Sequence, residues 1–483
     1  MAQTRMPPTI VDLPVELCTM IFLESWIDSP GVVLPGPIVA STPTCISMVC
    51  RQWRQIALST PALWSIYDIT CSYKTGDEEA RRVVLYLLPF IARAGTREIS
   101  IKTKCSDVWM SPLLEIIPGA AGIGAASLAV AIGGFSDLED YDYDDLAIPT
   151  YYGNFVLRLG PSDASAIPRL RRLVLSSTGF GHFFGWPMAD FAHWRRLPRQ
   201  LTIFRASTVR MSMADSVRIL RACPLLEEGA FTLDDSSSPL PIKRKGPDIL
   251  HPLRLHLPNL KTLHVAFLEL DCSFWDVLTV PNLLHLSISV DSHQLGDRDD
   301  WLPSDAPFTA LLQRSVPPLT TLALHFDFTG YPAEWLAILA RLPTLEALTV
   351  RFYVPWGPPD AGLCAFADGL CIGPPRSGPP LVPRLRTLRM DTNADMVRMA
   401  LSRAGGTAHQ AGCHLTHVTL YAAGPALITD AIARLERRGV NVAVENIAFF
   451  GGLRLECGID CFDFEVPQEF VDSCKAPCVH CMY

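Results

Sequence analysis

Cysteine thiols are the side chains in this sequence with the clearest capacity for chemistry, because five of the fifteen cysteines fall within the last 27 residues. These five are Cys457, Cys461, Cys474, Cys478 and Cys481. Paired thiolates at short spacing can hold zinc tetrahedrally. Two of the pairs, however, enclose three residues, whereas a zinc ribbon usually encloses about two. We therefore expect reduced thiols and no bound metal, and these cysteines are the only candidate zinc ligands.

No other spacing of reactive residues predicts catalysis. The twelve histidines are scattered without a His-Glu-x-x-His pairing, and no phosphate loop or nucleophile elbow follows a predicted strand. Gly122 and Gly124 have the spacing that begins a dinucleotide loop, but Ser127 replaces the third glycine. The acidic run over residues 137–145 lacks the glycine and the ligand spacing of a calcium loop. The sequence thus predicts neither a catalytic residue nor a cofactor.

Composition limits the partners and the compartment. The chain has 483 residues, of which 49% are hydrophobic and 19% are charged, so we expect a compact protein. Its 41 basic and 49 acidic residues give a net charge of −8, which disfavours nucleic acid and anionic membranes as partners. Asp12 and two early prolines interrupt what would be a secretory signal. We expect a cytoplasmic or nuclear protein whose cysteines are mostly reduced.

One uncharged stretch, residues 116–135, is as long as a membrane span. Pro118 and five glycines make it only weakly hydrophobic. A buried turn, strand and turn is the expected structure there.

Two helices are predicted near the N-terminus. Asp12 is a plausible N-cap and Pro14 suits the first turn, so a helix begins near Leu13. A second helix is predicted over residues 45–57, where apolar residues recur at three- and four-residue steps. Pro61 ends it, and Trp64 is expected to fold back as an aromatic anchor. By periodicity alone, these helices could simply bury their apolar stripes against each other.

Three segments in this region, LPVELCTMIF (13–22), VCRQWRQIA (49–57) and STPALW (59–64), resemble the F-box in its fungal versions. The resemblance covers about sixty residues, and it departs from the family where residues 29–43 lengthen the first connection. It implies docking on a Skp-type adaptor that bridges to a cullin. The implied adaptor-binding residues are Leu13, Pro14, Leu17, Ile21, Phe22, Val49, Cys50 and Trp53.

A repeated pattern fills most of the remaining chain: a proline is followed by apolar residues two, five and seven positions later. From residue 258 onward the prolines are separated by 23, 36, 26 and 40 residues, which is enough for one strand and one helix. Helical patterns lie between them, at residues 215–223, 334–342 and 426–435. The prolines are Pro168, Pro258, Pro281, Pro317, Pro343 and Pro383, and Leu415, Val418 and Leu420 repeat the spacing without one.

This pattern resembles divergent leucine-rich repeats over residues 94–456, although their asparagine or cysteine ladder is not consistent here. The expected fold class is α/β: a small all-α F-box module followed by a solenoid with a parallel sheet on its concave side and helices outside. The alternative for this region is a doubly wound α/β enzyme domain, which shares the alternation of strand and helix.

The expected organisation is a tail (1–8), an F-box domain (9–68), a linker (69–93), the solenoid (94–456) and a cysteine-rich cap or tail (457–483). The implied function is that of the substrate-recognition subunit of an SCF-type cullin-RING ubiquitin ligase, which binds a protein substrate and has no catalytic site. Two alternatives stay open. One is a scaffold that binds the adaptor or other proteins without ubiquitination, and the other is an enzyme within the repeat region.

Overall fold

The computed structural model describes the elements that carry the sequence patterns above. The described residues are 13–27, 32–33, 42–70, 89–90, 92–95, 99–104, 127–133, 171–177, 199–233, 254–267, 273–290, 305–325, 332–351, 361–372, 380–406, 408, 412–422 and 429–446. The fold is α/β, with parallel strands and helices. The chain divides into two compact units, one of residues 1–210 with 455–483 and one of residues 211–454.

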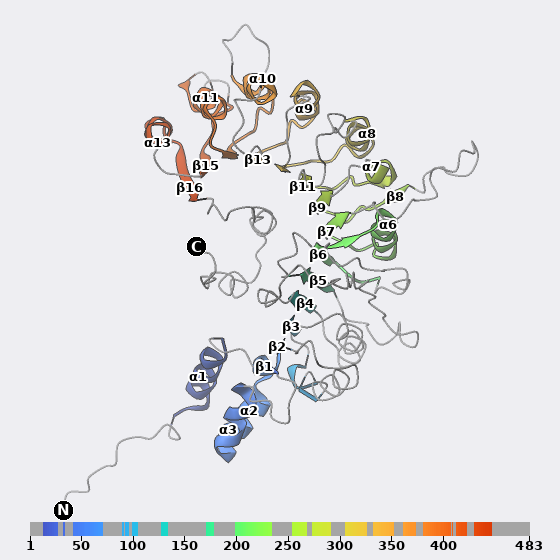
Figure 1. The fold of residues 1–483 in the computed structure, drawn as a ribbon, viewed down its shortest axis with the longest axis vertical. Coiled ribbons are helices and arrows are strands. Elements are labelled where there is room, and N and C mark those ends of the chain that lie inside the picture. Colours follow the sequence, from blue (N-terminus) through green and yellow to red (C-terminus); the bar gives the residue numbers. More distant parts are fainter. Residues whose placement is uncertain are drawn as a thin grey trace, which may run out of the picture. The chain divides into compact units, whose positions relative to one another are not determined.

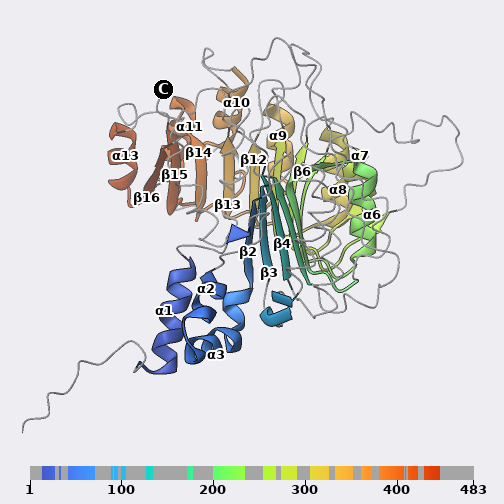
Figure 2. The same cartoon turned by 60° about the horizontal axis from the view of Figure 1, so that its bottom comes forward.

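The first unit begins with helices, which Figure 2 shows as α1, α2 and α3. Helix α1 spans Val15–Ile27, α2 spans Thr42–Val49, α3 spans Arg51–Ser59, and the 3-10 helix η2 spans Pro61–Trp64. The prediction of one continuous helix over residues 45–57 is wrong, because the chain breaks at Cys50. Cys50 is extended, with φ −155°, and its Sγ accepts a hydrogen bond from the backbone N–H of Trp53. The thiol thereby caps a new helix.

The helices of this unit enclose a small apolar core. Trp64 is 2% exposed and its Nε1–H donates to the Ala57 carbonyl at 2.8 Å, which confirms the predicted aromatic anchor. Phe22 meets Trp53 edge to face, with the ring centroids 4.9 Å apart. Beside these rings Ile56 is 3% exposed. The three helices and η2 therefore hold one another in place.

The strands of the first unit pair in chain order, and every pair is parallel. They are β1 (Val32–Val33), β2 (Ile66–Thr70), β3 (Ile99–Lys104), β4 (Ser127–Gly133), β5 (Arg172–Ser177) and β6 (Ile203–Met211). Strand β4 lies inside the uncharged stretch, as predicted. Across the described parts of the chain, no helix combines the length and the apolar character that crossing a membrane requires.

The strands of the second unit also pair in chain order and in parallel. The predicted apolar alternation is confirmed: in β9, for example, Leu263, Val265 and Phe267 are buried and the positions between them are half-buried. The strands are β7 (Glu228–Leu233), β9 (Thr262–Phe267), β11 (His285–Val290), β12 (Thr321–His325), β13 (Ala347–Arg351), β14 (Thr387–Asp391), β15 (His417–Ala422) and β16 (Asn441–Asn446). Two short strands, β8 (Leu255–His256) and β10 (Leu278–Thr279), pair separately.

Helices connect these strands and lie along one side of them (Figure 1). They are α6 (Met213–Ala222), α7 (Ser273–Val277), α8 (Asp305–Ser315), α9 (Pro332–Leu339), α10 (Ala361–Leu370), α11 (Ala394–Arg403) and α13 (Thr429–Glu436). Helices α6, α9 and α13 confirm the three predicted helical patterns. Buried aromatic rings lie between neighbouring helices. The ring centroids of Trp275 and Phe308 are 5.4 Å apart, and those of Phe308 and Trp335 are 6.1 Å apart. Helices α7, α8 and α9 thus pack in succession.

Polar side chains at the starts of the strands tie each strand–helix unit to the one before it. Asn282 donates through Nδ2 to the Pro258 carbonyl at 2.7 Å. Thr344 donates through Oγ1 to the Leu319 carbonyl at 2.8 Å. Equivalent bonds join Asn259 to Pro224, Thr320 to Leu284 and Thr416 to Arg386. We call these five bonds the Asn and Thr ladder. They precede the strands, whereas the asparagine or cysteine of a well-formed leucine-rich repeat follows its strand.

Arginines near helix ends make a second set of hydrogen bonds between successive strand–helix repeats. Arg314 Nη2 donates to the Trp275 and Leu278 carbonyls at 2.6 and 3.0 Å. Arg438 donates to the carbonyl of Leu401. Arg403 is 0% exposed and donates to carbonyls from three residues, which are Leu370, Leu381 and Val382. Two of the acceptors, Leu370 and Leu401, lie in the last turns of α10 and α11, where carbonyls have no partner within the helix.

Candidate docking surface on the N-terminal helices

Exposed apolar side chains gather on α1, α2 and α3. Among the described residues, ten large hydrophobic side chains are exposed, and seven of these ten belong to the three helices. Met48 is 71% exposed, and Met20 and Val49 are each 61% exposed. We call the seven the helical patch: Val15, Leu17, Met20, Ile21, Met48, Val49 and Leu58. Apolar side chains concentrated in this way mark an interaction surface.

The residues implied by the F-box resemblance divide into two groups. Leu17, Ile21 and Val49 belong to the helical patch, and Pro14 is exposed beside it. The others are partly or wholly enclosed. Leu13, Cys50 and Trp53 are half-buried, whereas Phe22 is only 2% exposed and packs on the Trp53 ring. Phe22 therefore supports the helical patch from beneath.

Four members of the helical patch were missed by sequence reasoning, namely Val15, Met20, Met48 and Leu58. The missed signal lies in the composition of α1, VELCTMIFLESWI, in which nine of 13 residues are apolar. One helix face is enough to cover a core, so a helix that is apolar on more than one face needs a second partner. A search for one apolar stripe finds only the buried face.

The helices that carry the helical patch are held together by buried side chains and by a hydrogen bond. Beneath it Cys18 is 1% exposed and Ile46 is 8% exposed. Arg54 Nε of α3 donates to the Ser47 carbonyl of α2 at 2.9 Å, which ties these two helices together. The exposed Glu16 and Glu24 of α1 border the apolar side chains with negative charge. Burial of such a surface in an interface would be favourable.

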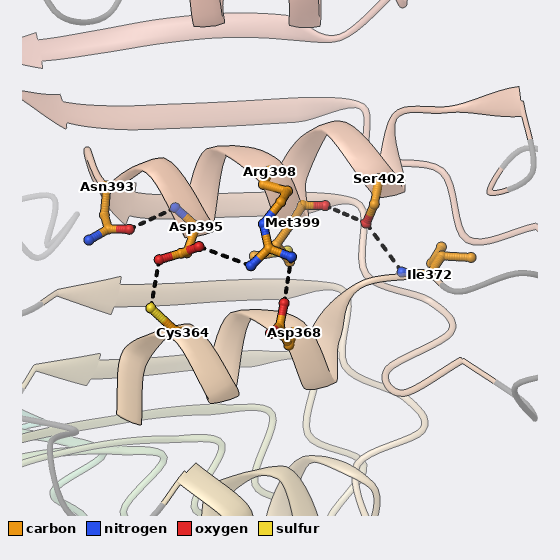
Figure 3. Close-up of polar contacts among 8 residues, drawn as sticks. All are labelled: Cys364, Asp368, Ile372, Asn393, Asp395, Arg398, Met399 and Ser402. Carbon is orange, nitrogen blue, oxygen red and sulfur yellow. Dashed lines mark hydrogen bonds and ion pairs between the residues drawn. The ribbon is translucent and has the colours of Figure 1, made fainter. Parts of the chain in front are cut away.

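Helices α10 and α11 share a polar network that involves a cysteine (Figure 3). Cys364 Sγ donates to Asp395 Oδ2 at 2.8 Å. Arg398 reaches Asp395 at 2.9 Å and Asp368 at 2.5 Å, so it joins the two helices. Asn393 Oδ1 caps α11 by accepting from the Asp395 backbone N–H.

The charges in this network disfavour a reactive thiol. The hydrogen bond to Asp395, followed by desolvation, raises the pKa of Cys364. The same bond, with that from Arg398, lowers the pKa of Asp395. A nucleophilic cysteine requires a lowered pKa. We therefore assign the network a structural role in joining α10 to α11.

The structure does not describe the candidate zinc ligands or the acidic run. Cys457, Cys461, Cys474, Cys478 and Cys481 lie outside the described residues, as does the acidic run 137–145. Within the described ranges, no group of three or more histidine, cysteine or acidic side chains could hold a metal ion.

The chain matches no protein-family model, and no curated protein is significantly similar to it.

Proposed function

We propose that this protein is an F-box subunit of a cullin-type ubiquitin ligase. In this proposal α1, α2 and α3 dock on a Skp-type adaptor, and the strand–helix repeats bind a protein substrate. The observation that carries the proposal is the helical patch, since five of its seven residues lie in the first two segments that resemble the F-box and the other two adjoin them. Burying one such side chain contributes roughly 1.5–3 kcal/mol, so several together can support a stable complex.

The order of the strands favours a leucine-rich-repeat-like solenoid for the remainder. A doubly wound enzyme domain reverses its strand order at a switch point, where the ligand binds, and has helices on both faces. Within each unit, by contrast, the described strands other than β8 and β10 pair in chain order. The Asn and Thr ladder and the helices on one side of the second unit agree with stacked repeats.

The proposed contribution to catalysis is proximity alone. The helical patch would attach the chain to the ligase, and the repeats would hold the substrate near the ubiquitin-loading subunits. Other subunits would transfer ubiquitin, so the proposal requires no catalytic residue in this chain.

Co-precipitation with a Skp-type adaptor and its cullin tests the proposal. We expect the intact chain to capture both, and a Met20→Glu, Val49→Glu variant to capture neither, because a carboxylate would have to be desolvated in the interface. Leu225→Glu is the matched control, since Leu225 is 50% exposed but lies outside the patch. Circular dichroism should show that all three chains are folded.

Failure of the intact chain to bind the adaptor would refute the proposal. A scaffold that binds the adaptor without causing degradation is the second possibility. Deleting residues 9–68 should lengthen the half-life of a bound protein if the complex is degradative, and should leave that half-life unchanged if the chain is a scaffold.

A further inference from the structure

The described methionines fall into two groups that differ in exposure. Met20 and Met48 are 61% and 71% exposed, and both belong to the helical patch. The others are at most 2% exposed, and they are Met211, Met213, Met390, Met396 and Met399. Among the described residues, the thioether sulfurs that solvent can reach are therefore those of the proposed docking surface.

Both exposed methionines have apolar neighbours in the patch. Leu17, Met20 and Ile21 are spaced three and four residues apart, so their side chains share one face of α1. Leu17 and Ile21 are 46% and 42% exposed. Met48 precedes Val49 at the C-terminal end of α2. A polar group on either sulfur would therefore interrupt a continuous stretch of apolar surface.

An exposed thioether reacts with peroxides. The methionine sulfur attacks one oxygen of hydrogen peroxide, the O–O bond breaks, an S–O bond forms and the other oxygen leaves as water. The sulfur loses two electrons, and these reduce the peroxide. The product is methionine sulfoxide, in which a flexible apolar side chain has become polar.

A sulfoxide on the helical patch would oppose docking. Its oxygen binds water in the free chain, and burying it without a hydrogen-bond donor is unfavourable. An interface that accommodates methionine supplies apolar contacts to the same position. The buried methionines are accessible to peroxide only when the chain opens locally. Peroxide should therefore modify the docking surface before it modifies the core.

We propose that Met20 and Met48 are sites of reversible oxidation, and that their sulfoxides prevent the helical patch from docking on the adaptor. This inference rests on the proposed function, because it concerns the regulation of the same surface. Methionine sulfoxide reductases regenerate the thioether, so docking is regained on reduction. A bound adaptor covers both sulfurs, so the free chain is the form that peroxide modifies.

The test treats the full chain with hydrogen peroxide and then with dithiothreitol, which reduces disulfides and sulfenic acids but leaves sulfoxides. Peptide mass spectrometry should show Met20 and Met48 oxidised at least about tenfold faster than Met396 and Met399. The treated chain should bind the Skp-type adaptor at least about tenfold more weakly than the untreated chain. Sulfoxide reductases should restore the affinity. Adaptor added before peroxide should protect both sulfurs.

Two variants assign the effect to these methionines, and each chain is compared with itself before and after treatment. The variant Met20→Leu, Met48→Leu keeps apolar side chains of similar volume and helix propensity but has no sulfur there, so peroxide should not change its affinity. Met396→Leu is the matched control, and it should lose as much affinity as the intact chain.

A third variant needs no oxidant. Met20→Gln, Met48→Gln carries polar side chains of similar size, so it should bind the adaptor at least about tenfold more weakly than the intact chain. Leu225→Gln, at a position 50% exposed and outside the helical patch, should not weaken binding.

Three results would overturn the inference. They are equal oxidation rates for exposed and buried methionines, unchanged adaptor binding by the oxidised chain, and an equal loss of affinity in the intact chain and the leucine variant. If the untreated chain bound the adaptor in these cases, the proposed function would stand without the inference. If the untreated chain did not bind, the proposed function would fail and the inference with it.

Discussion

His325 is a buried base that should make the protein sensitive to acid. Desolvation, followed by the charges of Arg351 and His264, lowers the pKa of His325 to about 3. The unfolded chain takes up this proton near pH 6.5, so His325 leaves stability intact above that pH and reduces it progressively as the pH falls toward 3. At pH 5 the free energy of unfolding should be about 2 kcal/mol lower than at pH 7.

Urea denaturation at pH 7 and pH 5 would measure this effect. His325→Gln should lose less stability than the intact chain over the same interval. His285→Gln, a change at an exposed position, should behave like the intact chain. An equal loss in the intact chain and in His325→Gln would contradict the assignment.

The Cys364 thiol should react slowly with alkylating reagents. Its hydrogen bond to Asp395 raises its pKa, and only the thiolate is nucleophilic. Asp395→Asn removes the charge, so alkylation of Cys364 at pH 8 should become several-fold faster, up to about tenfold for each unit of pKa. Mass spectrometry can follow the rate, with the exposed Cys45 as an internal reference whose rate should not change.

At the scale of one helix, Cys50 decides where α3 begins. Its Sγ accepts from the Trp53 N–H at 3.4 Å, an ordinary length for a bond to sulfur, which is a weak acceptor. Cys50→Ser should preserve or strengthen the cap, whereas Cys50→Ala should lower the free energy of unfolding by about 1 kcal/mol. Denaturant titration of the two variants would show the difference, and equal stabilities would mean that the cap contributes nothing.

The capping cysteine also explains the one element that was wrongly predicted. Apolar residues continue at helical spacing through Cys50, so the sequence pattern favoured one helix. Cysteine is not among the usual N-cap residues, and a break without glycine or proline leaves no local signal. By contrast, the strands that belong to the repeated spacing were predictable, because each carries apolar residues at fixed alternate positions, as in Leu348 and Val350 of β13.

Contacts between successive strand–helix repeats were less predictable than the helices and strands themselves. The Asn and Thr ladder depends on hydroxyl or amide groups reaching carbonyls 24 to 36 residues away, and no local pattern encodes such pairing. Likewise, the helical patch could be predicted in part from the F-box resemblance, but Met20 and Met48 required the helix packing.

Replacing Arg403 would show how much one strand–helix repeat contributes to the stability of the next. Desolvation lowers its pKa to about 10, so it remains charged at neutral pH while donating to three carbonyls. Arg403→Met should lower the free energy of unfolding by about 3–5 kcal/mol, because it leaves buried carbonyls without donors. Arg384→Met, at an exposed position, should cost less than about 0.5 kcal/mol. Similar denaturation midpoints for the two variants would contradict this role.

Strand pairing in chain order has a consequence for how the chain tolerates change. Because the described strands other than β8 and β10 pair in chain order within each unit, an insertion between two of them moves no other pairing out of register. The connections can therefore lengthen independently, which agrees with proline separations that range from 23 to 40 residues. Such a chain can acquire new surface one connection at a time, while the hydrogen-bonded ladder beneath keeps the same spacing throughout.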